Sequence, residues 1–135
     1  MTAATPHPAS PSSGCIGIVD DDEDIRRALR RLLIASGFSV RAYASGEAFL
    51  ESHDAPDCLV LDVHLGGMTG LELYEQLRNT GAVPPVVFIT AHHELSDSIE
   101  RLGALCLWKP FDGQALLSAI DTARREAAQR PAPGA

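Results

Sequence analysis

Short apolar runs that alternate with segments of helical periodicity constrain the fold of this chain more than any other feature. The first helical segment shows the pattern clearly, because its apolar residues recur at i, i+3, i+4, i+7 and i+8 from Ile25 to Leu33. The runs are mostly continuously apolar, as strands are when helices cover both faces of a parallel sheet. They comprise Cys15–Asp20, Phe38–Tyr43, Cys58–Asp62, Val86–Thr90 and Leu105–Trp108. We therefore predict an α/β fold, a (βα)5 flavodoxin-like doubly wound parallel sheet with strand order 2-1-3-4-5.

Capping signals place the helices between these strands. Ser, Thr and Asp side chains accept hydrogen bonds from the free N–H groups at a helix start, and Gly commonly ends a helix. Thr69 followed by Glu72 has the spacing of a capping box. The predicted helices run from about Asp24 to Ser36, from a cap at Ser45 to Ser52, from Thr69 to Asn79, from a cap at Ser96 to Leu102, and onward from a cap at Asp112.

Length and composition favour one folded domain. The chain has 135 residues and is 45% apolar, which is enough for one packed core. Residues 14–128 are predicted to form the domain, and residues 1–13 and 129–135 are predicted to be disordered tails because Pro, Ala and small polar residues dominate them. No apolar stretch approaches the ~18 residues of a membrane span. The first residues do not resemble a secretory signal, so we expect a cytoplasmic protein without membrane contact.

Charge and cysteine content exclude further classes. The formal net charge of −7 lacks the basic footprint of nucleic-acid binders, so direct nucleic-acid binding is not expected. Cys15, Cys58 and Cys106 lack the spacing of metal ligands, and we interpret them as buried free thiols.

Polar residues follow four of the predicted strands at their carboxyl ends. Asp20 and Asp21 follow the first, Asp62 the third, Thr90 the fourth and Lys109 the fifth. These ends share one edge of a parallel sheet, and the first and third strands are neighbours at the switch point where ligands bind. Three carboxylates together suit Mg²⁺, which prefers oxygen ligands and retains several waters. Asp21 and Asp62 are expected to ligate directly, Asp20 through water, and the His64 carbonyl to complete the set.

The same edge suits phosphoryl chemistry. A carboxylate can attack a phosphoryl group and form an aspartyl phosphate, and Asp62 is the best candidate because it stands alone at its strand end. Lys109 would neutralise one phosphoryl oxygen and Thr90 would donate a hydrogen bond to another. Each residue alone has a plainer interpretation, such as a solvated acidic loop, a surface lysine or an ordinary strand residue. The ordered conjunction of all four strand ends favours the functional interpretation.

These segments resemble the receiver domain of two-component response regulators over about residues 14–128. The matching segments are Ile18–Asp22, Leu61–Gly70, Ile89–His92 and Lys109–Phe111. The resemblance implies that Asp62 accepts a phosphoryl group from a sensor histidine kinase or phosphotransfer protein, and that the chain is not an enzyme. It implies Mg²⁺ at Asp20, Asp21, Asp62 and the His64 carbonyl, and phosphoryl contacts from Thr90 and Lys109. It also implies a cis peptide bond before Pro110.

The resemblance further implies that Thr90 moves toward the phosphoryl group and that the surface of the fourth helix, fifth strand and fifth helix changes. That surface would bind a downstream protein target, and homodimerisation there is possible. No output domain is apparent, so we expect a stand-alone receiver. His64 and His92 each follow a site residue by two positions; they tune dephosphorylation in one interpretation and are exposed loop residues in the other.

Two positions and the length of one stretch depart from the family pattern. Cys106 stands three residues before the lysine, where the family usually has an aromatic residue, although Trp108 is nearby and should point to the face opposite Leu107. The stretch from Thr90 to Lys109 is a few residues short, which predicts an abbreviated fourth helix. Gly66 replaces a common proline and should make its loop more mobile.

Two alternative functions remain open on the sequence. The chain can be a phosphorylation-independent interaction module that has kept the fold, which the Cys106 and short-helix departures favour. It can also be a Mg²⁺-dependent phosphohydrolase with an aspartyl nucleophile. Such enzymes usually carry a second carboxylate two residues after the nucleophile, where this chain has His64.

Overall fold

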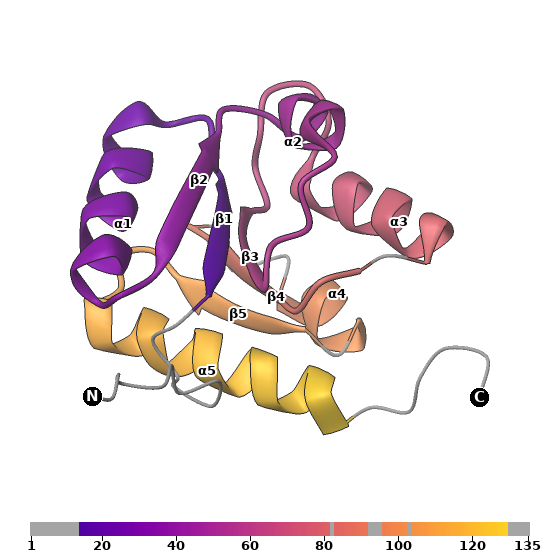
Figure 1. The fold of residues 1–135 in the computed structure, drawn as a ribbon. Coiled ribbons are helices and arrows are strands. Elements are labelled where there is room, and N and C mark those ends of the chain that lie inside the picture. Colours follow the sequence, from indigo (N-terminus) through magenta and orange to yellow (C-terminus); the bar gives the residue numbers. More distant parts are fainter. Residues whose placement is uncertain (1–13, 82, 92–95, 103, 130–135) are drawn as a thin grey trace, which may run out of the picture.

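Five parallel strands form one sheet in the computed structural model, which describes residues 14–81, 83–91, 96–102 and 104–129. The strands are β1 (Cys15–Val19), β2 (Ser39–Tyr43), β3 (Cys58–Asp62), β4 (Val86–Thr90) and β5 (Leu105–Trp108), and their order in the sheet is β2-β1-β3-β4-β5. All four strand pairings are parallel (Figure 1). The predicted fold and strand order are confirmed.

Five helices alternate with the strands. They are α1 (Glu23–Ala35), α2 (Gly46–Ser52), α3 (Gly70–Thr80), α4 (Ser96–Arg101) and α5 (Gly113–Gln129). Most predicted boundaries differ by about one residue, within the usual uncertainty of helix and strand ends. The first strand ends at Val19, so Asp20 lies just beyond it. The predicted tails fall mostly outside the described residues, and their disorder stays a prediction.

Side-chain capping explains most helix starts. The Asp112 carboxylate accepts a hydrogen bond from the N–H of Ala115 at 2.7 Å, and Thr69 and Glu72 form the predicted capping box. The side chain of Ser45 caps α2 as predicted. Helix α4 is described over six residues, Ser96–Arg101, which agrees with an abbreviated fourth helix; residues 92–95 lie outside the described residues, so the predicted cap at Ser96 stays a prediction.

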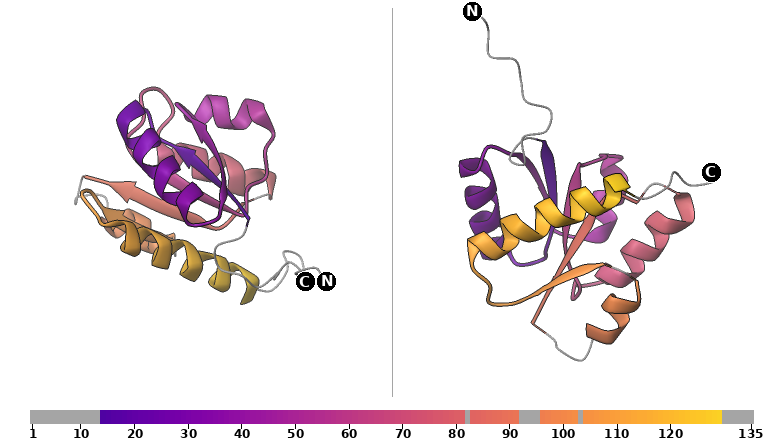
Figure 2. Two further views of the ribbon diagram at one scale, coloured as in Figure 1. Left: turned by 60° about the vertical axis from the view of Figure 1, so that its left-hand side comes forward. Right: turned by 90° about the horizontal axis from the view of Figure 1, so that it is seen from below.

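The sheet separates two apolar layers. Alternate strand residues, Ile18, Val60 and Ile89 among them, pack with α1 and α5, whereas Leu61, Phe88 and their equivalents pack with α2, α3 and α4. Figures 1 and 2 show the helices in these two layers. Every residue of β3 and β4 is buried, as expected for central strands covered on both faces.

Gly70 fixes how closely α3 approaches β3. A Cβ atom at this position would lie 2.3 Å from the carbonyl oxygen of Asp62 and 2.9 Å from Cα of Val63. Both are backbone atoms of the segment that carries the candidate site, and the N–H of Gly70 donates a hydrogen bond to the Val63 carbonyl at 2.9 Å. Because Gly70 has no side chain, the start of α3 can pack directly against the loop after Asp62.

Among the described residues, none of the helices has the length and apolar character that a membrane crossing requires. The three cysteines are free, but only Cys58 is buried. The prediction of buried thiols was therefore wrong for Cys15 and Cys106, which are half-buried because Cys15 begins β1 and Cys106 lies on the outermost strand.

Candidate functional site at the carboxyl edge of the sheet

The carboxyl ends of β1, β3 and β5 bring three charged side chains together. The Lys109 ammonium lies 3.2 Å from a carboxylate oxygen of Asp20 and 3.2 Å from one of Asp62. Asp20 and Asp62 are buried, and the Lys109 side chain is 21% exposed. Asp20 lies 89 positions and Asp62 lies 47 positions before Lys109 in the sequence, yet the three side chains meet at one point. This was predicted from the strand ends.

Asp21 completes an acidic cluster with Asp20 and Asp62. Carboxylate oxygens of the three residues all lie within 4.8 Å of one another. Asp21 is exposed, so the cluster opens to solvent on its side. Three oxygen donors with one open side fit a hard divalent cation such as Mg²⁺, which takes carboxylate ligands and keeps water in its remaining positions. The acidic cluster is thus consistent with a site for a divalent metal ion.

Burial and charge together perturb the Asp62 carboxyl. Burial raises its pKa, and the nearby Asp20 carboxylate raises it further, while Lys109 and the N–H of His64 lower it; the net pKa lies above the ordinary value. The His64 N–H donates to Oδ1 of Asp62 at 3.1 Å, while Oδ2 faces Lys109. Without a metal ion, the ionised form of Asp62 is therefore held at a cost.

Burial and the neighbouring carboxylates shift the pKa of Lys109 in opposite directions. Burial lowers the pKa of its ammonium, but the carboxylates of Asp62 and Asp20 outweigh burial and the net pKa is raised. Lys109 is therefore a firmly charged cation at neutral pH. Its backbone N–H also donates to the Thr90 carbonyl at 2.7 Å, and the peptide bond to Pro110 is cis as predicted.

Thr90 lies at the same edge but on the other face of the sheet. It is fully buried at the end of β4. Ile89 packs in the layer of α1 and α5 and Phe88 in the layer of α2, α3 and α4, so strand alternation directs Thr90 toward the second layer. The same alternation directs Asp62 toward the first layer. The Thr90 hydroxyl must therefore turn at the strand end to reach a group bound to Asp62, and its phosphoryl contact stays a prediction.

The loop after β3 lies over the acidic cluster. A Cβ atom at Gly66 would lie 4.0 Å from an Asp21 carboxylate oxygen. The His64 side chain is exposed, and the predicted ligation by its carbonyl oxygen stays a prediction. His92 lies outside the described residues, so its predicted role stays open as well.

Two residues that hold Asp20 in place were missed in the sequence interpretation. Asp22 caps α1 by accepting hydrogen bonds from Asp24 and Ile25, and its own N–H donates to Oδ1 of Asp20 at 2.9 Å. The Arg26 guanidinium donates to the Asp20 carbonyl at 2.7 Å. An Asp placed just before an amphipathic helix is a recognisable cap signal, whereas nothing in the sequence distinguishes Arg26 from its neighbours on α1.

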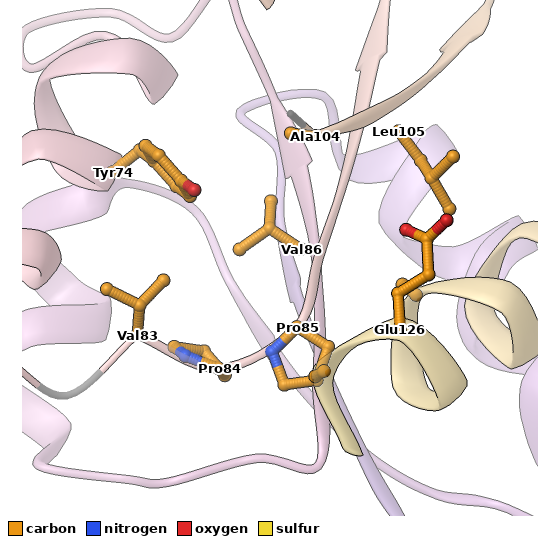
Figure 3. A pocket seen from close by; sticks show the side chains of 10 residues that line it. Tyr74, Val83, Pro84, Pro85, Val86, Ala104, Leu105 and Glu126 are labelled. Carbon is orange, nitrogen blue, oxygen red and sulfur yellow. The ribbon is translucent and has the colours of Figure 1, made fainter. Parts of the chain in front are cut away.

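The opposite edge of the sheet carries different chemistry. A cavity of about 30 Å³ lies at the amino ends of β4 and β5, and its lining includes Val83, Pro84 and Pro85. Figure 3 shows Tyr74 of α3 and Glu126 of α5 on opposite sides of it, with Val86 and Pro85 between them. The lining of this cavity includes no lysine and only one carboxylate, that of Glu126, whereas the acidic cluster found among the described residues lies at the carboxyl edge.

Comparison with known proteins assigns the family. Residues 16–121 match the model of the response regulator receiver domain. The chain belongs to this receiver family. The receiver domain is 37% identical over 115 residues to the transcriptional regulatory protein FixJ of Azorhizobium caulinodans, a match that covers 82% of this chain and 54% of FixJ. It therefore spans about half the length of that relative.

Solved structures agree with this assignment. The response regulator StyR superposes with a TM-score of 0.77 at 40% identity, over 86% of this receiver and 61% of StyR. The receiver domain of DrrB, solved in a BeF3-activated form, has a TM-score of 0.74 at 28% identity over 84% of this receiver and 98% of that chain. The acidic pocket of Asp20, Asp21 and Asp62 with Lys109 is consistent with phosphoacceptor activity of a receiver, and receivers of this family partner with histidine kinases.

Proposed function

We propose that this receiver accepts a phosphoryl group on Asp62 from the phosphohistidine of a sensor histidine kinase or phosphotransfer protein. The observation that carries the proposal is the junction of Asp62 with Asp20, Asp21 and Lys109 at the carboxyl edge of the sheet. A carboxylate oxygen of Asp62 attacks phosphorus, a P–O bond forms, and the P–N bond breaks so that the electron pair leaves with the imidazole. The receiver would then carry an aspartyl phosphate.

The protein groups act by position and charge. Lys109 neutralises a phosphoryl oxygen next to Asp62, and the Thr90 hydroxyl donates to another after it turns at the end of β4. Mg²⁺, when bound, would supply positive charge that stabilises the transferred phosphoryl group. Asp20, Asp21 and Asp62 would hold that ion, and the N–H of His64 keeps the Asp62 carboxylate oriented.

Phosphorylation would change the charge of the site and bias a protein-binding surface toward one of two states. We place that surface at α4, β5 and α5, where the partner is a downstream protein target or a second copy of the receiver. The activation of the DrrB receiver by BeF3, a tetrahedral analogue of a phosphoryl group, supports a similar response here.

The test uses intact mass after incubation with Mg²⁺ and acetyl phosphate. Wild type should gain the mass of one phosphate, and the gain should disappear with EDTA and in Asp62→Asn. Asp57→Asn is a matched control that alters an aspartate just before β3 and should still gain phosphate. An equal gain in Asp62→Asn would contradict the assignment of the acceptor.

A second candidate is a phosphorylation-independent interaction module. The six-residue α4 and Cys106 at the position of the usual aromatic residue favour it, because both lie on the proposed output surface. This candidate predicts that Mg²⁺ binds, seen as a rise in melting temperature, while wild type gains no phosphate from acetyl phosphate.

A further inference from the structure

Trp108 is the side chain next to Thr90 across the β4–β5 ladder. Thr90 and Trp108 are register partners in the parallel pairing of these strands, and neighbouring strands lie only about 4.8 Å apart. Cys106, the residue at the usual aromatic position, is instead the partner of Phe88, two residues earlier. In this receiver the aromatic ring therefore stands beside the threonine itself.

Both side chains also share one face of the sheet. Leu105 and Leu107 pack in the layer of α1 and α5, whereas Cys106 packs with α2, α3 and α4. Strand alternation then directs Trp108 to the same side as Cys106 and Thr90. Helix α4 packs on β5 on this side, and Trp108 is half-buried, so it connects a buried threonine with the surface.

Movement of the Thr90 hydroxyl should affect Trp108, because the two side chains share one face of the sheet. The Thr90 hydroxyl starts on the α4 side, while Asp62 and Lys109 belong to the other face, so contact with a phosphoryl group on Asp62 withdraws the hydroxyl from the α4 side. Protein interiors are close-packed, so a side chain that moves changes the packing of its neighbours. Trp108 borders Thr90 in register and has a solvent-accessible portion that can adjust.

We infer that Trp108 reads the state of Asp62 through Thr90, so that phosphorylation changes the packing and solvent access of the Trp108 ring beneath α4. The inference rests on the proposed function. It makes Trp108 a positioning residue of the output surface rather than a catalytic residue, and it assigns to this position the coupling that Cys106 cannot provide with a small thiol two residues away from Thr90.

The composition of the chain makes the test direct, because Trp108 is the only tryptophan. Its emission spectrum and its quenching by acrylamide are measured with Mg²⁺ alone and with Mg²⁺ plus trifluoroberyllate, at a concentration where the melting temperature has stopped rising. Wild type should show a shifted emission maximum and an altered quenching constant at this plateau.

The variants separate a packing change from a direct effect of charge at the adjacent Lys109. Thr90→Val should lose the change in quenching at its own plateau, Thr90→Ser should retain it because the hydroxyl remains, and Cys106→Ala should retain it as a matched control on the same strand and face. A full change in Thr90→Val, or none in saturated wild type, would overturn the inference.

The acetyl phosphate mass measurement keeps the two failures apart. If wild type gains phosphate but the Trp108 quenching constant does not change, only the inference fails. If wild type gains no phosphate, the proposed function fails and the inference falls with it.

Discussion

Strands β3 and β5 both deliver a charged side chain to the site, yet they differ in depth. All five residues of β3 are buried, whereas all four residues of β5 are half-buried at the edge of the sheet. Asp62 therefore sits on a rigid central strand, and Lys109 follows a strand with one free side. We infer that the central strand β3 fixes the position of Asp62, the proposed acceptor, whereas the edge strand β5 positions Lys109, which neutralises the Asp62 charge and has more room to adjust.

The largest effect should come from matched core truncations in the two strands. Leu59→Ala in β3 should lower the free energy of unfolding by about 2–5 kcal/mol, because Leu59 is fully buried. Leu105→Ala in β5 should cost roughly half as much, since Leu105 is only partly buried in the folded protein. Urea unfolding measures both variants. Equal losses would show that β5 is as tightly packed as β3.

Mg²⁺ bound at the acidic cluster should raise the free energy of unfolding. At a hundredfold excess over its dissociation constant, one bound ion adds about 2.7 kcal/mol to the free energy of unfolding. Asp21→Asn should lose most of this gain and leave the metal-free stability within about 0.5 kcal/mol, because Asp21 is exposed. Urea unfolding with and without Mg²⁺ measures the gain. Glu51→Gln, an exposed acid on α2, should keep it in full.

Lys109→Met should remove the ion pairs that join the end of β5 to Asp20 and Asp62. Two buried carboxylates would lose their shared cation, and we expect a loss of about 1–3 kcal/mol in the absence of Mg²⁺, reduced from the cost of a fully buried pair by the 21% exposure of Lys109. Guanidinium unfolding of the metal-free protein measures this loss. Removal of an exposed pair by Arg125→Met should cost less than about 0.5 kcal/mol. A Lys109→Met protein as stable as wild type would show that the pair does not hold β5 to the site.

The pH dependence of metal-free stability should carry the signature of Asp62. Its pKa is raised in the folded state by burial and by Asp20, so the folded protein binds the proton more tightly than the unfolded chain. Stability should therefore fall as pH rises from the ordinary aspartate pKa through the raised one. Comparison of wild type with Asp62→Asn in EDTA isolates this slope. No difference in slope between the two proteins would mean that the carboxyl is unperturbed.

Thiol alkylation should give the smallest contrast between the strands. Burial raises the pKa of Cys58 in β3 to about 12 and that of Cys106 in β5 to about 11. At a given pH, Cys106 then has the larger thiolate fraction, and it is also more accessible. Iodoacetamide labelling followed by peptide mass analysis should modify Cys106 before Cys58. Faster labelling of Cys58 would mean that β3 opens more readily than the edge strand.

The part of the site formed by the central strands β1 and β3 can be predicted from the sequence better than the part formed by the edge strand β5. The apolar run into Asp62 and the acidic pair after β1 place three carboxylates at one switch point from local pattern and general topology alone. The capping box at Thr69 and the cap at Asp112 are equally local signals. By contrast, the hydrogen bond from Arg26 to the Asp20 carbonyl and the close approach at Gly70 depend on packing between segments.

The edge strand shows the limit of sequence interpretation most plainly. The alternation of β5 was predictable, but the partner of Trp108 was not, because it depends on the register between β4 and β5. Counted from Lys109 in the sequence, Cys106 occupies the position of the usual aromatic residue. The strand register instead places Trp108 beside Thr90. The burial of Cys106 was predicted wrongly for a related reason, since its exposure follows from the position of β5 at the edge of the sheet.

The most direct test of the account is to locate the phosphoryl group chemically. Wild type is phosphorylated with acetyl phosphate and Mg²⁺ and then reduced with borohydride, which converts an aspartyl phosphate into homoserine. Peptide sequencing by mass spectrometry should find homoserine at position 62 and unmodified aspartate at positions 20 and 21. Homoserine at Asp20 or Asp21 with an unchanged Asp62, or none in a protein that binds Mg²⁺, would contradict the assignment of Asp62 as the acceptor.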